Sequence, residues 1–202
     1  NTIKLNKIYV WGLLICSLIS FFCLMYGYII SDFSILNVYQ NSHSSNPLIY
    51  KIAATWGNHE ASMLLWMLVL AIFNFLIFKL YNQKNLNYIS KALEVQGFII
   101  LGFLLFTILT SNPFKKVLTF QSDGLGFNPI LQDPALAIHP PLLYIGYVGF
   151  SAVFSLSVAA LALPFKNIKI FCFCYMKTFV IIAWAFLTIG IALGSIWAYY
   201  EL

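Results

Sequence analysis

IYVWGLLICSLISFFCLMYGYII, residues 8–30 of the chain, contains no charged side chain. A helix needs about 20 such apolar residues to cross a bilayer. Four later segments, at residues 61–78, 95–110, 142–165 and 179–198, have the same character. The sequence therefore predicts an all-α polytopic membrane protein with about five transmembrane helices. We expect residues 1–202 to form a single transmembrane domain.

The composition supports the same fold class. The chain is 61% hydrophobic and 8% charged, whereas soluble domains carry about 25% charged residues. Its net charge of +5 comes from 11 lysines. Lysines beside membrane spans set topology, so we expect the lipid bilayer and no nucleic acid as a partner. The four cysteines match no zinc spacing.

The loops differ strongly between the two expected sides of the membrane. One side has the N-terminus and two loops, 79–91 and 166–177, which together hold eight of the 11 lysines. The opposite side has two long loops, 31–60 and 111–141, which hold all three histidines. By the positive-inside rule the long loops lie on the outer face, periplasmic or facing the intermembrane space. Functional loops are expected there.

A histidine followed by two prolines lies where the second long loop meets a span, in QDPALAIHPPLLY (residues 132–144). Pro140 and Pro141 restrict φ and remove two backbone donors, so we expect His139 to be held rigidly at a helix start. Tyr144 follows as an aromatic floor suited to a flat macrocycle. The residues leave two interpretations open: a hydrogen-bonded histidine at a helix end, and a metal or haem ligand.

The first long loop ends in WGNHE, residues 56–60. Met63 occupies the position where a zinc-protease motif needs a second histidine, which excludes that motif. His59 and Glu60 either cap the next span, where an acid favours the helix dipole, or contact a bound cofactor or partner. Trp56 is by default an interfacial aromatic residue.

The last span ends in LGSIWAYYEL, residues 193–202. Its small residues permit close helix contact, and Trp197 then enters the outer interface. A structural and a functional role for this end are equally open.

These motifs, in this order, resemble the CcmF family, the large membrane subunit of the cytochrome c haem-attachment machinery. The resemblance covers almost the whole chain. It rests on residues 31–36 (SDFSIL), 56–60, 110–114 (TSNPF), 128–134 (NPILQDP), 139–144 (HPPLLY) and 193–202.

The resemblance implies a haem site on the outer face. It makes His139 the axial ligand of haem iron, with haem b as the cofactor, and assigns no catalytic residue. The other expected cofactor contacts are Pro140, Pro141, Tyr144, His59, Glu60, Trp56 and Trp197. The family's tryptophan-rich segment would follow Leu202, and its further haem-ligand histidines have no counterpart in the chain. We therefore expect an N-terminal part of a larger protein, inactive alone.

The implied function is that of a component of the cytochrome c haem lyase in a bacterial or mitochondrial inner membrane. It would position haem for covalent, thioether-forming attachment to apocytochrome c. The implied partners are the haem chaperone CcmE, CcmH/CcmI-type apocytochrome-handling proteins and apocytochrome c itself. A haem exporter or transporter subunit and a structural scaffold of the maturation complex are the alternatives, and the nitrite-reductase paralogue shares the same motifs.

Overall fold

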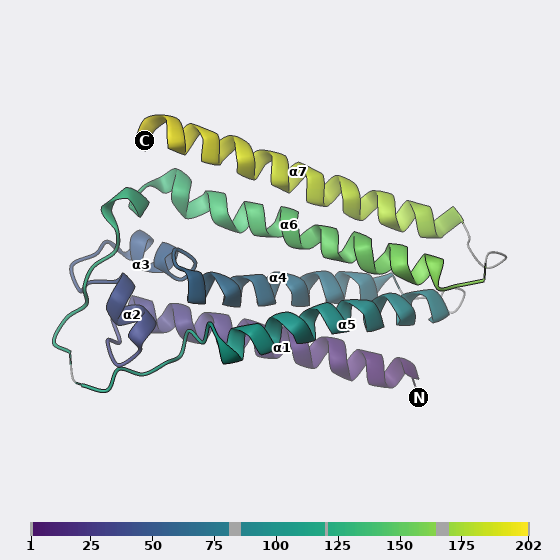
Figure 1. Ribbon diagram of the computed structural model, residues 1–202, viewed down its shortest axis with the longest axis horizontal. Coiled ribbons are helices and arrows are strands. Elements are labelled where there is room, and N and C mark those ends of the chain that lie inside the picture. The colour runs from purple at the N-terminus through teal and green to yellow at the C-terminus, as the bar shows by residue number, and fades with distance from the viewer. Residues whose placement is uncertain (1, 81–85, 120, 165–169, 202) are drawn as a thin grey trace.

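The computed structural model describes residues 2–80, 86–119, 121–164 and 170–201. Within them, five helices are long and apolar enough to cross a membrane (Figure 1), which confirms the predicted all-α polytopic fold. They are α1 (Thr2–Ile29), α4 (His59–Lys79), α5 (Leu86–Leu109), α6 (Pro134–Leu161) and α7 (Ile170–Glu201). The loops add the short helices α2 (Leu36–Asn41), α3 (Leu48–Ala54) and η1 (Pro129–Leu131).

All five long helices begin earlier than the apolar segments predict, and three of them do so by eight or nine residues. α5 begins at Leu86 rather than residue 95, and α7 at Ile170 rather than 179. α6 begins at Pro134 rather than 142, so Pro140 and Pro141 lie inside it. The expectation that His139 stands at a helix start is therefore wrong, because His139 lies in the second turn of α6.

Helix α4 occupies the centre of the bundle. It contacts α1, α5 and α6, while α7 packs chiefly on α6 along its length (Figure 1). Side chains on almost every side of α4 are buried, including Leu70, Asn74 and Ile77. Burial on almost every side distinguishes α4 from α1 and α7, which expose many large apolar side chains as expected of lipid-facing helices.

Polar side chains join α5 to α6 inside the bundle. Gln96 donates from Nε2 to Ser151 Oγ at 2.9 Å and accepts at Oε1 from Ser155 Oγ at 2.7 Å. Gln96 and Ser155 are fully buried. Because a buried amide needs its hydrogen bonds satisfied, this cluster fixes the register between the two helices.

The two ends of the bundle separate the group of lysines predicted on the inner side from the long loops. The N-terminus lies at one end, and α2, α3, the 110–133 connection and the C-terminal end of α7 lie at the other (Figure 1). The first end carries five of the lysines that the sequence places on the inner side: Lys4, Lys7, Lys79, Lys91 and Lys177. Lys84, Lys166 and Lys169 of the same predicted group lie outside the described residues.

The two long loops form one folded unit, called here the outer cap and comprising residues 30–58 and 110–133. Backbone hydrogen bonds join its halves: Leu36 N–H donates to Lys115 O at 2.7 Å, and Leu125 N–H donates to Tyr39 O at 2.8 Å. Asp123 accepts hydrogen bonds from Ser44 N–H at 2.9 Å and Ser44 Oγ at 2.5 Å. These bonds lower the pKa of the Asp123 carboxyl to about 2.

Candidate functional site

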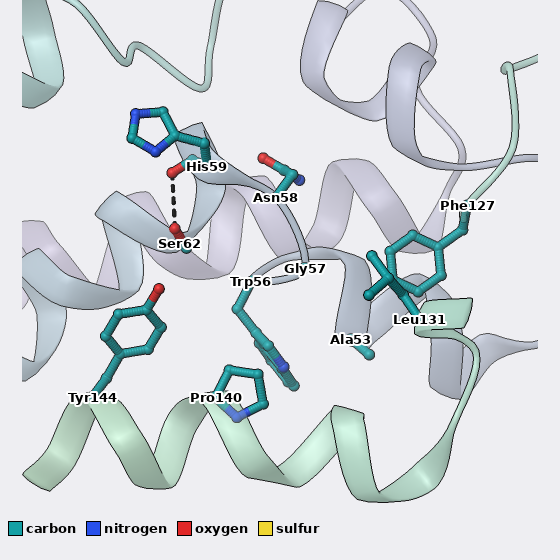
Figure 2. A pocket seen from close by; sticks show the side chains of 10 residues that line it. All are labelled: Ala53, Trp56, Gly57, Asn58, His59, Ser62, Phe127, Leu131, Pro140 and Tyr144. Carbon is teal, nitrogen blue, oxygen red and sulfur yellow. Dashed lines mark hydrogen bonds between the residues drawn. The ribbon is translucent and has the colours of Figure 1, made fainter. Parts of the chain in front are cut away.

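A cavity of about 290 Å³ lies between the outer cap, the first turn of α4 and the second and third turns of α6 (Figure 2). It brings together four of the residues predicted from the sequence: Trp56, His59, Pro140 and Tyr144. Its wall is completed by Ala53, Gly57, Asn58, Ser62, Phe127 and Leu131. The lining is mostly apolar or aromatic with a few polar groups, as in typical ligand pockets.

Asn58 forms the N-terminal cap of α4. Its Oδ1 accepts a hydrogen bond from Ala61 N–H at 3.0 Å, which is the bond expected of a cap side chain. The interpretation of His59 and Glu60 as the cap is therefore corrected, although Glu60 does lie in the first turn, where its charge favours the helix dipole. Glu60 is not among the residues that line the cavity.

The Asn58 side chain also belongs to a buried polar network. Its Nδ2 donates to Tyr28 Oη at 2.9 Å, while its Oδ1 accepts from Asn37 Nδ2 at 2.8 Å. Tyr28 Oη donates to Asn37 Oδ1 at 2.6 Å. Tyr28 is fully buried and Asn37 nearly so. The network joins α1, α2 and α4 behind the cavity. An asparagine directly before the first helical residues is a known cap signal, so Asn58 was the part of this network accessible to sequence reasoning.

Trp56 ties the start of α4 to α6. Its Nε1–H donates to Ala137 O at 3.0 Å. In an α-helix that carbonyl would accept from the N–H of residue 141, but Pro141 has no N–H. The indole also lies parallel to the Phe21 ring, with centroids 6.4 Å apart. Trp56 therefore replaces the hydrogen-bond donor that Pro141 lacks, which helps α6 to continue through its prolines.

His59 and Tyr144 line the cavity from facing helices (Figure 2). The exposed imidazole of His59 shares a hydrogen bond of 2.9 Å between Nε2 and Ser111 Oγ, and the ring meets Phe106 edge-on. The Tyr144 ring packs edge-on against Trp66, with centroids 5.5 Å apart. His59 is therefore held by the outer cap and Tyr144 by the bundle.

His139 faces α7 and does not line the cavity. Its Nδ1 lies 2.7 Å from the carbonyl oxygen of Gly190. A carbonyl oxygen only accepts, so Nδ1 carries the hydrogen and the neutral ring keeps its lone pair on Nε2. A Cβ added to Gly194 would lie 2.8 Å from Nδ1 and 3.0 Å from Nε2 of the same ring. The half-buried imidazole thus occupies the space that a side chain at position 194 of α7 would fill.

Trp197 lies one turn beyond Gly194 on α7. Its Nε1 is buried and has no hydrogen-bond partner among the described residues. The predicted site residues thus fall into two groups: the cavity residues on the α4 side of α6, and His139 at the α6–α7 interface, with Trp197 further along α7. Glu60 and Pro141 belong to neither group.

The described part of the chain has no group of three or more His, Cys, Asp or Glu side chains that could hold a metal ion.

The family model described as "Cytochrome C assembly protein" matches residues 56–202. The chain belongs to the cytochrome c assembly family. Similar proteins include the cytochrome c-type biogenesis protein CycK of Rhizobium meliloti, 50% identical over 94% of this chain and 28% of that protein. CcmF of Escherichia coli is 40% identical over 98% of this chain and 30% of that protein. NrfE of Haemophilus influenzae is 42% identical over 89% of this chain and 28% of that protein.

These relatives confirm the resemblance to CcmF that the motifs indicate. The chain spans less than a third of the length of the relatives it matches. No solved structure matches it. The match to the cytochrome c assembly family begins at Trp56, so it includes the cavity residues Trp56, His59 and Tyr144 and also His139.

Proposed function

We propose that the chain is a haem-handling component of cytochrome c maturation, in which His139 is the axial ligand of haem iron through Nε2. The observation that carries the proposal is the hydrogen bond from His139 Nδ1–H to Gly190 O. Histidines that bind metals almost always donate their other ring N–H in this way, because the bond fixes the tautomer and raises the basicity of the coordinating nitrogen.

Haem fits the donor set around His139. The described residues offer no cluster of ligands for a bare ion, whereas haem brings four nitrogens of its own and needs only axial ligands. Haem b would supply the iron and the vinyl groups to which the cysteine thiols of apocytochrome c add as thioethers. The chain's own part would be to hold and orient the group.

The cavity has a separate place in the proposal. Trp56, His59, Pro140 and Tyr144 line a space on another side of α6 from the His139 ring, so they would contact the edge of the bound group or an incoming partner rather than iron. Cofactor contacts through Pro141, Glu60 and Trp197 stay predictions.

The location and the partners follow from the same end of the molecule. The outer cap joins both long loops and holds His43, and His59 and His139 lie in the first two turns of the helices that follow its two halves. We place this end on the periplasmic or intermembrane-space face of an inner membrane. There a CcmE-type chaperone would deliver haem and CcmH/CcmI-type proteins would present apocytochrome c.

The test is haem retention in membranes that carry the chain together with the rest of its maturation system. We expect His139→Ala to lose the haem absorption of the purified complex and the yield of c-type cytochromes. His43→Ala, an exposed histidine of the outer cap paired with Asp123, is the matched control and should retain both.

Unchanged haem and unchanged cytochrome yield in His139→Ala, with assembly intact, would contradict the proposal and favour the scaffold alternative. Sealed vesicles separate attachment from export. Haem supplied on the outer side should suffice for maturation, and a requirement for haem on the inner side would favour a transporter.

A further inference from the structure

We propose that Gly190 and Gly194 of α7 form a contact surface for the His139 ring, called here the seat, which determines which ring nitrogen is free to bind a metal. In this seat the Gly190 carbonyl selects the Nδ1–H tautomer, and the missing side chain of Gly194 makes room for the ring. Gly190 and Gly194 are then positioning residues for coordination through Nε2. This inference rests on the proposed function and deepens it.

Gly190 brings the α7 backbone within reach of the imidazole. A Cβ at this position would lie 2.9 Å from Leu143 Cδ2 and 3.0 Å from the Leu143 backbone nitrogen, which is tighter than nine in ten real Cβ contacts. Without it, the helices approach until the Gly190 oxygen lies 2.7 Å from His139 Nδ1, which is at the short end of the range for N–H···O bonds. The absent side chain therefore makes the bond possible.

Gly194 lies one turn further along α7 on the same face. A Cβ there would overlap the His139 ring at Cε1 and also press on Nδ1 and Nε2. The ring has little freedom to move aside, because its Nδ1 is bonded to Gly190 and its backbone is followed by two prolines in the helix. An alanine at position 194 therefore displaces the ring and breaks its bond to the carbonyl.

The seat matters for the ligand because the two ring nitrogens compete for one hydrogen. If Nδ1 loses its acceptor, the hydrogen is no longer confined to it, and the Nε2–H form has no lone pair for iron. Removing such outer-shell partners costs about 10–100-fold in metal affinity. We expect Gly194→Ala to lower haem affinity by a factor in that range while the protein still assembles.

The decisive measurement is the tautomer of His139 in the haem-free protein. Solid-state NMR of the bilayer-embedded chain, labelled with ¹⁵N-histidine, is recorded well above the ordinary histidine pKa of about 6.5. With three histidines in the chain, His139→Gln identifies the signal. The wild type should show a protonated Nδ1 and a bare Nε2. A protonated Nε2 with a bare Nδ1 in the wild type would overturn the inference without any variant of α7.

Gly194→Ala should shift the His139 signal toward the other tautomer or a mixture, and an unchanged signal would overturn the inference. Two controls should leave the signal as in the wild type. Gly102→Ala makes the same change in α5, where an added Cβ meets nothing within 4 Å. Ser195→Ala changes the exposed neighbour of Gly194 on α7.

A haem titration keeps the two proposals apart. Haem binding that survives His139→Ala would refute the axial-ligand proposal, whereas the tautomer in the haem-free protein tests the seat by itself. His139→Ala could lose haem while Gly194→Ala binds it with wild-type affinity and spectrum. That result would support His139 as the ligand and overturn the positioning role of Gly194.

Discussion

Replacing Asn58 by alanine should destabilise the bundle far more than the loss of one surface amide. The change removes the cap bond to Ala61 N–H. It also removes the acceptor of Asn37 Nδ2 and a donor to Tyr28 Oη. Asn37 and Tyr28 are buried, so water cannot readily replace the lost partner.

The magnitude follows from two contributions. Loss of an N-cap side chain costs about 1 kcal/mol, and leaving a buried donor unsatisfied costs about 1–3 kcal/mol. We therefore expect Asn58→Ala to lower the free energy of unfolding by about 2–4 kcal/mol. Asn58→Asp keeps the Oδ1 acceptor for both Ala61 and Asn37 but loses the donor to Tyr28, and should cost less.

Reversible unfolding of the purified chain in detergent micelles, followed by circular dichroism, measures these differences. Asn112→Ala is the control, because Asn112 makes one exposed bond to its own loop and should stay within about 0.5 kcal/mol of wild type. A double-variant cycle with Asn37→Ala isolates the coupling, expected at about 0.5–3 kcal/mol. An Asn58→Ala loss no larger than that of the control, or a zero coupling, would refute the network argument.

Three further predictions concern the outer end. Trp56→Phe keeps an aromatic ring but leaves Ala137 O without a donor, which should lower the free energy of unfolding by about 1–3 kcal/mol. In a Pro141→Ala background, where residue 141 regains its N–H, the same change should cost less. An equal loss of stability in both backgrounds, measured by thermal unfolding, would contradict this role of Trp56. Gly124→Ala places a Cβ against a backbone carbonyl of the facing loop. This overlap should lower the stability of the outer cap by about 1–3 kcal/mol and make its proteolysis faster. Proteolysis at the wild-type rate would contradict the prediction. The pKa of Asp123 is lowered to about 2 on folding. The contribution of Asp123 to the stability of the outer cap is therefore present above its unfolded pKa of about 3.9 and is lost as the pH falls toward 2. Asp123→Asn should remove this pH dependence from the protection of the outer cap against proteolysis, and an unchanged pH profile would refute the assignment.

The spans were predictable from the sequence because a bilayer imposes a minimum apolar length. Their starts were less so. Residues 86–94 of α5 include Ser90 and Glu94, which reduce the hydropathy of the segment, yet Ser90 accepts a hydrogen bond from Asn6 and Glu94 pairs with Lys91. The contact of Ser90 with Asn6 on α1 is tertiary, and no local pattern announces it, whereas Lys91 and Glu94 form an i,i+3 pair within α5 itself.

The start of α6 was missed for a different physical reason. Two consecutive prolines normally indicate a helix boundary, but the donor that Pro141 lacks is replaced by Trp56 from another part of the chain. His139 could be selected as a candidate ligand from its sequence context, whereas its acceptor on α7 could not be predicted. A partner 51 residues away becomes visible only when α6 and α7 are packed together.

The central position of α4 constrains the order in which the chain can assemble during synthesis. When α4 leaves the ribosome, α1 has already been made, while α5 and α6, which bury other sides of α4, have not. Until they arrive, the sides of α4 that α5 and α6 cover in the finished bundle would face lipid or the translocation channel. We therefore expect a chain stalled just after α4 to lack the contacts that α5 and α6 make with this helix, and translation through α6 to complete its packing.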